Sequence, residues 1–75
     1  MKELIEYIAK QIVNNPDAVV VTEETSEAGI ILKLQVADED KGRVIGKQGR
    51  IVQAMRTLLR VKAAKASVKA SLEII

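Results

Sequence analysis

The 75-residue sequence contains no cysteine and no histidine. Their absence excludes disulfide frameworks, thiolate or imidazole metal sites, and every catalytic triad that needs a histidine. Tyr7 is the only aromatic residue, so the binding of bases by stacking on aromatic rings is not expected. No apolar run approaches the roughly 18 residues of a membrane span, and the first turn of the chain is too acidic for a signal peptide. We therefore expect one cytoplasmic domain outside the membrane, with no metal or other cofactor.

No pair of a nucleophile and a base is evident, and no cofactor fingerprint is present. The sequence therefore predicts a protein that is not an enzyme and has no small-molecule substrate.

Charge is divided unevenly along the chain, although the net charge is only +2. Residues 41–72 contain nine lysines and arginines and no acid, whereas the remaining residues contain three lysines against ten acids. Such a division favours an anionic partner, either nucleic acid or a membrane surface.

Hydrophobic periodicity predicts three helices and three strands in one domain over residues 1–75. Helical spacing of apolar residues marks helices, and alternation or a β-branched run marks strands. The expected elements are helix 2–13, strand 18–23, strand 30–36, helix 39–45, helix 50–62 and strand 66–74. The order αββααβ implies an α+β fold in which the helices cover one face of a three-stranded sheet.

Several local details accompany this prediction. The run Asn14–Pro16 should end the first helix with a left-handed cap, and Asp38 should cap the second. Strand 18–23 is expected to be buried. The third helix should turn one apolar side to the core, formed by Ile51, Ala54, Met55, Leu58 and Leu59.

Two glycines three residues apart, Gly46 and Gly49, lie between the second and third helices. Without Cβ atoms they permit a tight turn and the close approach of another backbone. The third helix begins directly after them, and its free N–H groups suit a phosphate. Lys47 and Arg50 add positive charge there. The spacing fits neither a P-loop nor a dinucleotide fingerprint, and a plain linker between two helices is the alternative.

The segment Val44–Ile51, placed between two helices and after a hairpin, resembles the KH domain. The element order is similar to that of the type II, prokaryotic form, and the resemblance covers essentially the whole chain. Residues 15–17 and 40–50, with Ala54, Arg56 and the Leu58–Leu59 pair, resemble the small bacterial single-KH RNA-binding proteins of the KhpA family.

The resemblance implies that the protein binds single-stranded RNA, or single-stranded DNA, with about four nucleotides across the loop. It implies that Gly46 and Gly49 allow the close approach while Lys47 and Gln48 meet phosphate. It further implies that Val36 lines the opposite wall of a cleft. The residues that we expect to bind RNA are Lys41, Arg43, Val44, Ile45, Gly46, Lys47, Gln48, Gly49, Arg50, Ile51 and Arg56.

Some alternatives stay open at this level. Arg56 and Arg60 fit either a solvated helix face or contacts to the RNA backbone. The acids at residues 23–27 and 38–40 fit ligands for a hard cation, although turns and helix caps explain them with fewer assumptions. The resemblance also implies a homodimer, or a heterodimer with a larger KH-containing protein. A structural assembly module that binds RNA weakly is therefore the second hypothesis, beside a post-transcriptional regulator or RNA chaperone.

Overall fold

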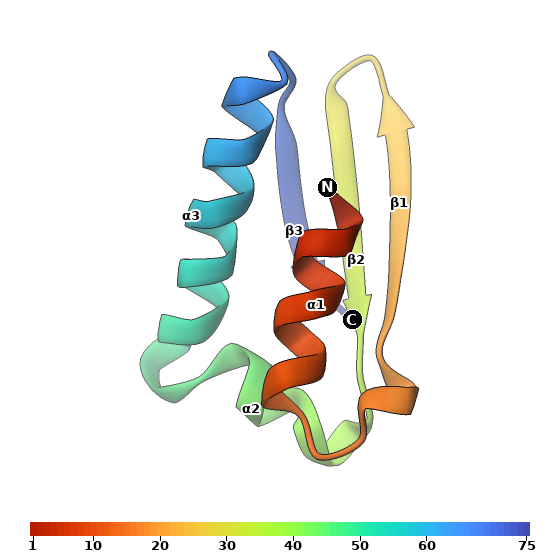
Figure 1. The fold of residues 1–75 in the computed structure, drawn as a ribbon, viewed down its shortest axis with the longest axis vertical. Helices are drawn as coiled ribbons and strands as arrows, with labels where there is room; N and C mark the ends of the chain where they lie inside the picture. Colours follow the sequence, from red (N-terminus) through yellow and green to blue (C-terminus); the bar gives the residue numbers. More distant parts are fainter.

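The computed structural model describes residues 1–75 and confirms the order αββααβ (Figure 1). Its helices are α1 (Lys2–Ile12), α2 (Lys41–Ile45) and α3 (Arg50–Lys65). Its strands are β1 (Val20–Ser26), β2 (Gly29–Gln35) and β3 (Ala70–Ile74). Short 3-10 turns occupy Pro16–Ala18, Asp38–Asp40 and Lys47–Gly49. No helix has the length and apolarity needed to span a bilayer.

The sheet has β2 at its centre, with β1 antiparallel and β3 parallel to it. The parallel pairing requires a crossover, and α2, the glycine loop and α3 supply it. Because the register places Leu32 beside Leu72 and Val21 beside Leu34, these four buried side chains share one face. That face and the helices form an α+β core, whose members are Ile5, Ala9, Val13, Val19, Val21, Leu32, Leu34, Val36, Val44, Val52, Met55, Leu59 and Leu72.

The first strand differs from the prediction in place and in burial. It begins at Val20 and not at residue 18, because Pro16 starts a 3-10 turn that includes Ala18. A proline suits a first helical position because its φ is fixed and its missing N–H is not needed there. Within β1 only Val21 is buried, since the strand lies at the edge of the sheet. The expectation of a buried strand was therefore wrong.

The third helix ends later than predicted, and the last strand begins later than predicted. Helix α3 continues to Lys65, and the chain then turns at Ser67, which has a φ of 58°. The amide of Val68 returns to the carbonyl of Ala63 at 3.0 Å, so this segment belongs to the helix end and β3 begins only at Ala70. The alternation of apolar and polar residues from Ala66 onward does not distinguish such a turn from a strand.

The buried side of α3 is rotated by about one residue from the predicted side. Its buried residues are Val52, Met55, Leu59 and Ala63. Ala54 is exposed, and Leu58 is 50% exposed, so both point away from the core. Apolar side chains on two sides of the helix made the periodicity ambiguous, and packing against β3 selects one of them.

This rotation gives a test with two neighbouring leucines. Leu59 is 1% exposed, so Leu59→Ala should lower the free energy of unfolding by about 2–5 kcal/mol through a cavity. Leu58→Ala should change it by no more than about 0.5 kcal/mol in dilute protein. Urea unfolding followed by circular dichroism measures both. Equal losses would contradict the orientation of α3.

Candidate nucleic-acid interface

The chain reverses between α2 and α3, and three of the four residues from 46 to 49 have a positive φ. Gly46, Gln48 and Gly49 have φ values of 77°, 59° and 72°. The Gly46 amide bonds to the Gly42 carbonyl at 2.9 Å, which closes α2, and the Gly49 amide bonds to the Gly46 carbonyl at 3.1 Å. Positive φ is costly for residues with a Cβ, so the two glycines are suited to this turn.

Gly46 is needed for a second reason, the close approach of α3. A Cβ atom at this position would lie 2.6 Å from Cγ1 of Ile51 and 2.9 Å from its backbone nitrogen. A Cβ atom at Gly49 would have more space, since its nearest neighbour, Cγ1 of Val52, would be 4.0 Å away. The first glycine therefore sets how tightly the loop folds onto α3, and the second supplies only the left-handed conformation that precedes the helix.

Backbone donors converge on this loop. Helix α3 begins at Arg50, as the sequence predicted, and its 16 residues direct the positive end of the helix dipole toward the loop. The amides of Lys47 and Gln48 have no partner among the hydrogen bonds of the turn. Free N–H groups at the start of a helix suit phosphate oxygens.

Exposed side chains add charge at the same place. Lys47, Gln48 and Arg50 are all exposed, and a guanidinium nitrogen of Arg50 lies 3.1 Å from the Gln48 side-chain oxygen. No acid forms an ion pair with Lys47 or Arg50, so both charges are available to a ligand. Ile45 stands next to the loop with 39% of its surface exposed.

Other residues that were predicted to bind RNA are buried or already paired. Val44 is completely buried in the core, which leaves it no surface for RNA, and its role is to anchor α2. Ile51 is half-buried against Gly46. Lys41 pairs with Asp38 at 3.4 Å, and Nε of Arg43 lies 3.5 Å from Asp40. These two cations are therefore already partly neutralised.

A hollow of about 110 Å³ lies between α3 and β3. Its walls are formed by Arg56, Leu59, Arg60, Ala70, Ser71 and Leu72. Val36, which the family resemblance implied on the opposite wall of the cleft, is 5% exposed and belongs to the core. The strand beside this hollow is instead β3, because β2 lies at the centre of the sheet and β3 has a free edge.

Arg56 lies in this hollow and has a partner there. Its Nε and one terminal nitrogen each lie 3.3 Å from the carbonyl oxygen of Leu72. Since β3 pairs only with β2, that carbonyl belongs to the unpaired edge of the sheet. The guanidinium is held at the edge of β3 and is not simply a solvated group on the helix. Arg60, one turn later, lines the hollow and is exposed.

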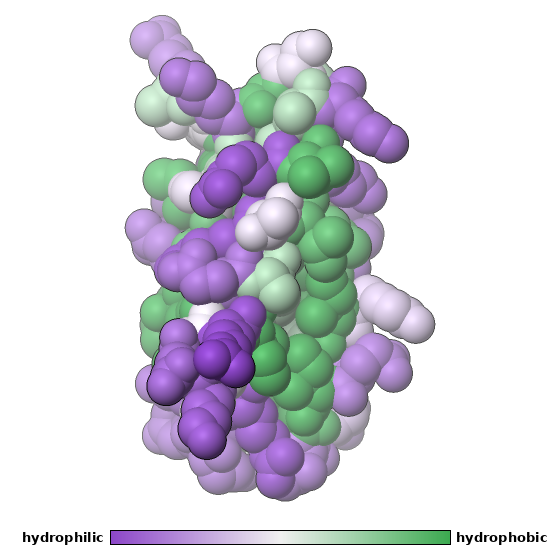
Figure 2. All heavy atoms as spheres, turned by 90° about the vertical axis from the view of Figure 1, so that its left-hand side faces the viewer, coloured by the Kyte–Doolittle hydropathy of each residue, from purple (hydrophilic) through white to green (hydrophobic).

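Helix α3 therefore has three sides, of which two reach solvent. Figure 2 shows an apolar strip beside hydrophilic side chains on the face of the molecule where α3 lies. The exposed apolar side chains of α3 include Ala54, Leu58 and Val61, which follow one another at i, i+4 and i+7. The opposite flank includes Arg56 and Arg60 and borders β3.

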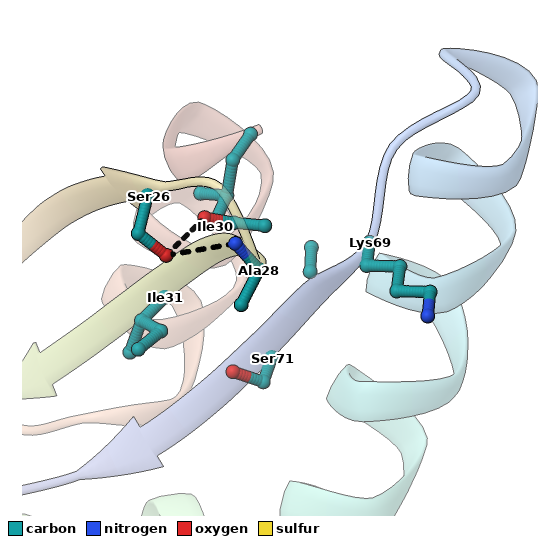
Figure 3. A pocket seen from close by; sticks show the side chains of 8 residues that line it. Ser26, Ala28, Ile30, Ile31, Lys69 and Ser71 are labelled. Atoms are coloured by element: carbon teal, nitrogen blue, oxygen red, sulfur yellow. Dashed lines mark hydrogen bonds between the residues drawn. The ribbon is translucent and has the colours of Figure 1, made fainter.

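A separate pocket of about 230 Å³ lies at the tip of the β1–β2 hairpin, far from the glycine loop (Figure 3). Lys69 is the one charged residue in its lining. The Ser26 hydroxyl is 3.2 Å from the Ala28 amide and 3.4 Å from the Gly29 carbonyl, so its polar capacity is used within the turn. The pocket therefore offers a ligand few polar contacts.

The acids of residues 38–40 behave differently from the prediction. No side chain of this run caps a helix. The expected left-handed cap of the first helix is also absent, because Val13, which follows α1, is extended. The Asp40 carboxylate is instead completely buried and accepts hydrogen bonds from the amides of Asn14 and Asn15. No local pattern indicates this contact, because it joins residues that lie 25 and 26 positions apart.

Comparison with known proteins places the chain in a family. The family model described as "KhpA/KhpB, KH domain" matches residues 2–74. A protein of Clostridium acetobutylicum named RNA-binding protein KhpA is 53% identical over 75 residues, which is the full length of both chains. Proteins with the same name in Listeria monocytogenes and Treponema pallidum are 49% and 50% identical, covering 99% and 92% of those proteins and at least 99% of this chain.

Both the fold and these similarities agree with the resemblance seen in the sequence. The family consists of RNA-binding KH proteins and not of enzymes. The family model matches nearly the whole chain, and about half of the residues are identical in several relatives. This chain therefore belongs to the KhpA/KhpB KH-domain family of bacteria.

Proposed function

We propose that the protein binds single-stranded RNA in the cytoplasm by holding the phosphate backbone at the loop Gly46–Gly49. The observation that carries the proposal is the loop itself, in which free amides at a helix start meet the unpaired charges of Lys47 and Arg50. A plain linker between helices has no need of two unpaired cations around bare glycines. The relatives named RNA-binding protein KhpA support the same function.

The backbone of the RNA would cross the loop, with about four nucleotides in contact. The bases would then lie toward the hollow between α3 and β3, whose wall contains the half-buried Ala70 and the exposed Ser71. Aliphatic contacts and the peptide groups on the free edge of β3 can hold bases without aromatic stacking. This arrangement fits a chain whose only aromatic residue, Tyr7, lies on α1.

A post-transcriptional regulator or an RNA chaperone is the role that such a module would serve. A four-nucleotide footprint with few charges gives modest affinity and little sequence discrimination. Single-stranded DNA presents the same phosphates, so we expect it to bind through the same loop. The preference for RNA would arise from contacts to the 2′-hydroxyl.

The proposal is tested by reversing charge in the loop. Lys47→Asp with Gln48→Asp should reduce RNA affinity to background, because the phosphate would face two carboxylates, whereas the fold should persist. Aspartate tolerates the positive φ of residue 48. A matched control, Lys2→Asp with Gln11→Asp, makes the same change of charge at exposed sites of α1. Filter binding and circular dichroism measure the two effects, and unchanged affinity in the loop variant would refute the proposal.

Salt dependence gives a second test. If about three phosphates are contacted, the slope of log K against log salt should be close to −2 for a single strand. The slope is measured by fluorescence anisotropy of a labelled oligonucleotide at several salt concentrations. A flat response would mean that apolar contacts and not phosphates provide the affinity.

The second candidate function, a dimerisation or assembly module, is favoured by one observation. Leu58 and Val61 on α3 are 50% and 54% exposed, and Ala54 extends the same strip by one turn. Packing this strip against the same strip of a second copy would remove apolar surface from water and link two short RNA footprints. A larger KH-containing protein with a similar helix could replace the second copy.

Leu58→Glu tests the strip. A carboxylate in an interface of two apolar helices would be desolvated without a partner, so the variant should be monomeric where the wild type is a dimer. Ala64→Glu is the matched control, because Ala64 is exposed on the other flank of α3 and should leave association unchanged. Light scattering after size exclusion gives the masses. A monomeric wild type would contradict the homodimer. For a heterodimer, we expect the wild type to capture a purified larger KH-containing protein and Leu58→Glu to abolish that capture.

A further inference from the structure

We infer that Asp40 is a positioning residue of the RNA site, because its buried carboxylate fixes α2, and with it Arg43 and the glycine loop, to the segment that follows α1. This inference rests on the proposed function. It assigns a role in binding to a residue that does not itself touch RNA and that is 0% exposed.

Three groups surround the two carboxylate oxygens: two backbone amides that donate hydrogen bonds, and the Arg43 guanidinium, which forms an ion pair. One oxygen lies 3.1 Å from the Asn14 amide nitrogen and 3.5 Å from Nε of Arg43. The other oxygen lies 3.0 Å from the Asn15 amide nitrogen. Asp40 is the only charged residue that is buried, and a buried charge is tolerated only when such partners replace its water.

These three groups come from two separate parts of the chain. Asn14 and Asn15 lie in the connection between α1 and the 3-10 turn at Pro16, whereas Arg43 lies one turn after Asp40 on α2. The contact through Nε restrains the stem of Arg43. Because 52% of that side chain is exposed, the terminal nitrogens of its guanidinium remain free for an anion.

Helix α2 needs an external restraint of this kind. It has five residues and no side-chain cap, and Val44 is its only buried side chain. Isolated helices shorter than about 12 residues are marginal in water, so tertiary contacts must hold α2 in place. The Gly46 amide bonds to the Gly42 carbonyl, so the loop is attached to the end of this helix and moves with it. The Asp40 contacts therefore set the direction in which the loop presents its donors.

Asp40→Asn is the direct test. The amide has a single oxygen for the two backbone amides, its NH2 group would face a donor, and the attraction for Arg43 is reduced. RNA affinity should fall about fivefold at a temperature far below the unfolding midpoint. In addition, Arg43→Ala should cost less affinity in the Asp40→Asn protein than in the wild type, because Arg43 is no longer held.

A purely structural role predicts a different outcome. Val21→Ala destabilises the core at β1, far from the loop, and serves as the control for stability alone. When fully folded, it should bind RNA as the wild type does. If Asp40→Asn and Arg43→Ala have additive effects on affinity, or if Asp40→Asn binds normally when folded, the positioning role is refuted.

A second variant applies if Asp40→Asn does not fold. Arg43 is exposed, so Arg43→Lys should preserve the fold and the charge. Lysine lacks the planar guanidinium, in which Nε faces Asp40 while the terminal nitrogens point elsewhere, so its ammonium group would not be held in the same direction. The variant should lose nearly as much affinity as Arg43→Ala, whereas retention of wild-type affinity would overturn the inference. Failure of the proposed function is distinguishable, since then the charge reversal at Lys47 and Gln48 would also leave affinity unchanged.

Discussion

The fold of this small domain depends on the absence of a side chain at residue 46. There the chain must leave α2 and enter α3 within a few residues, and the backbone of Gly46 lies against Ile51 where no Cβ would fit. The contact fixes how closely α3 follows α2. It also holds the loop, with its amides and charges, against the first turn of α3. Structure and binding site thus share one steric constraint.

Local sequence patterns were sufficient for the element order and for the loop. The alternation around Leu32 and Leu34, the spacing around Ile5 and the pair of glycines each carry their signal within a few residues. Burial on a particular side of α3 could not be predicted in this way. Val52 and Leu58 are both apolar, and only contact with the sheet decides that Val52 is buried while Leu58 is exposed.

Long-range polar contacts were beyond prediction for the same reason. Nothing near Asp40 in the sequence distinguishes it from Asp38, yet one is completely buried and the other is almost fully exposed. The acid-free block of residues 41–72 gave a similarly incomplete picture. Two of its cations, Lys41 and Arg43, pair with acids that precede the block, whereas Lys47 and Arg50 at the loop have no acidic partner. Composition alone does not show which cations of the block are paired.

The separation of charge across the molecule has a consequence for motion in solution. The loop and α3 lie on one side of the fold, and the hairpin with Glu23, Glu24 and Glu27 lies on the other (Figure 1). Because the opposite charges lie on different sides, the molecule has an electric dipole in addition to its net charge of +2. The field of an RNA strand would exert a torque on this dipole and turn the basic side toward the strand before contact. The torque acts only at short range, because physiological salt weakens the field strongly beyond about 8–10 Å.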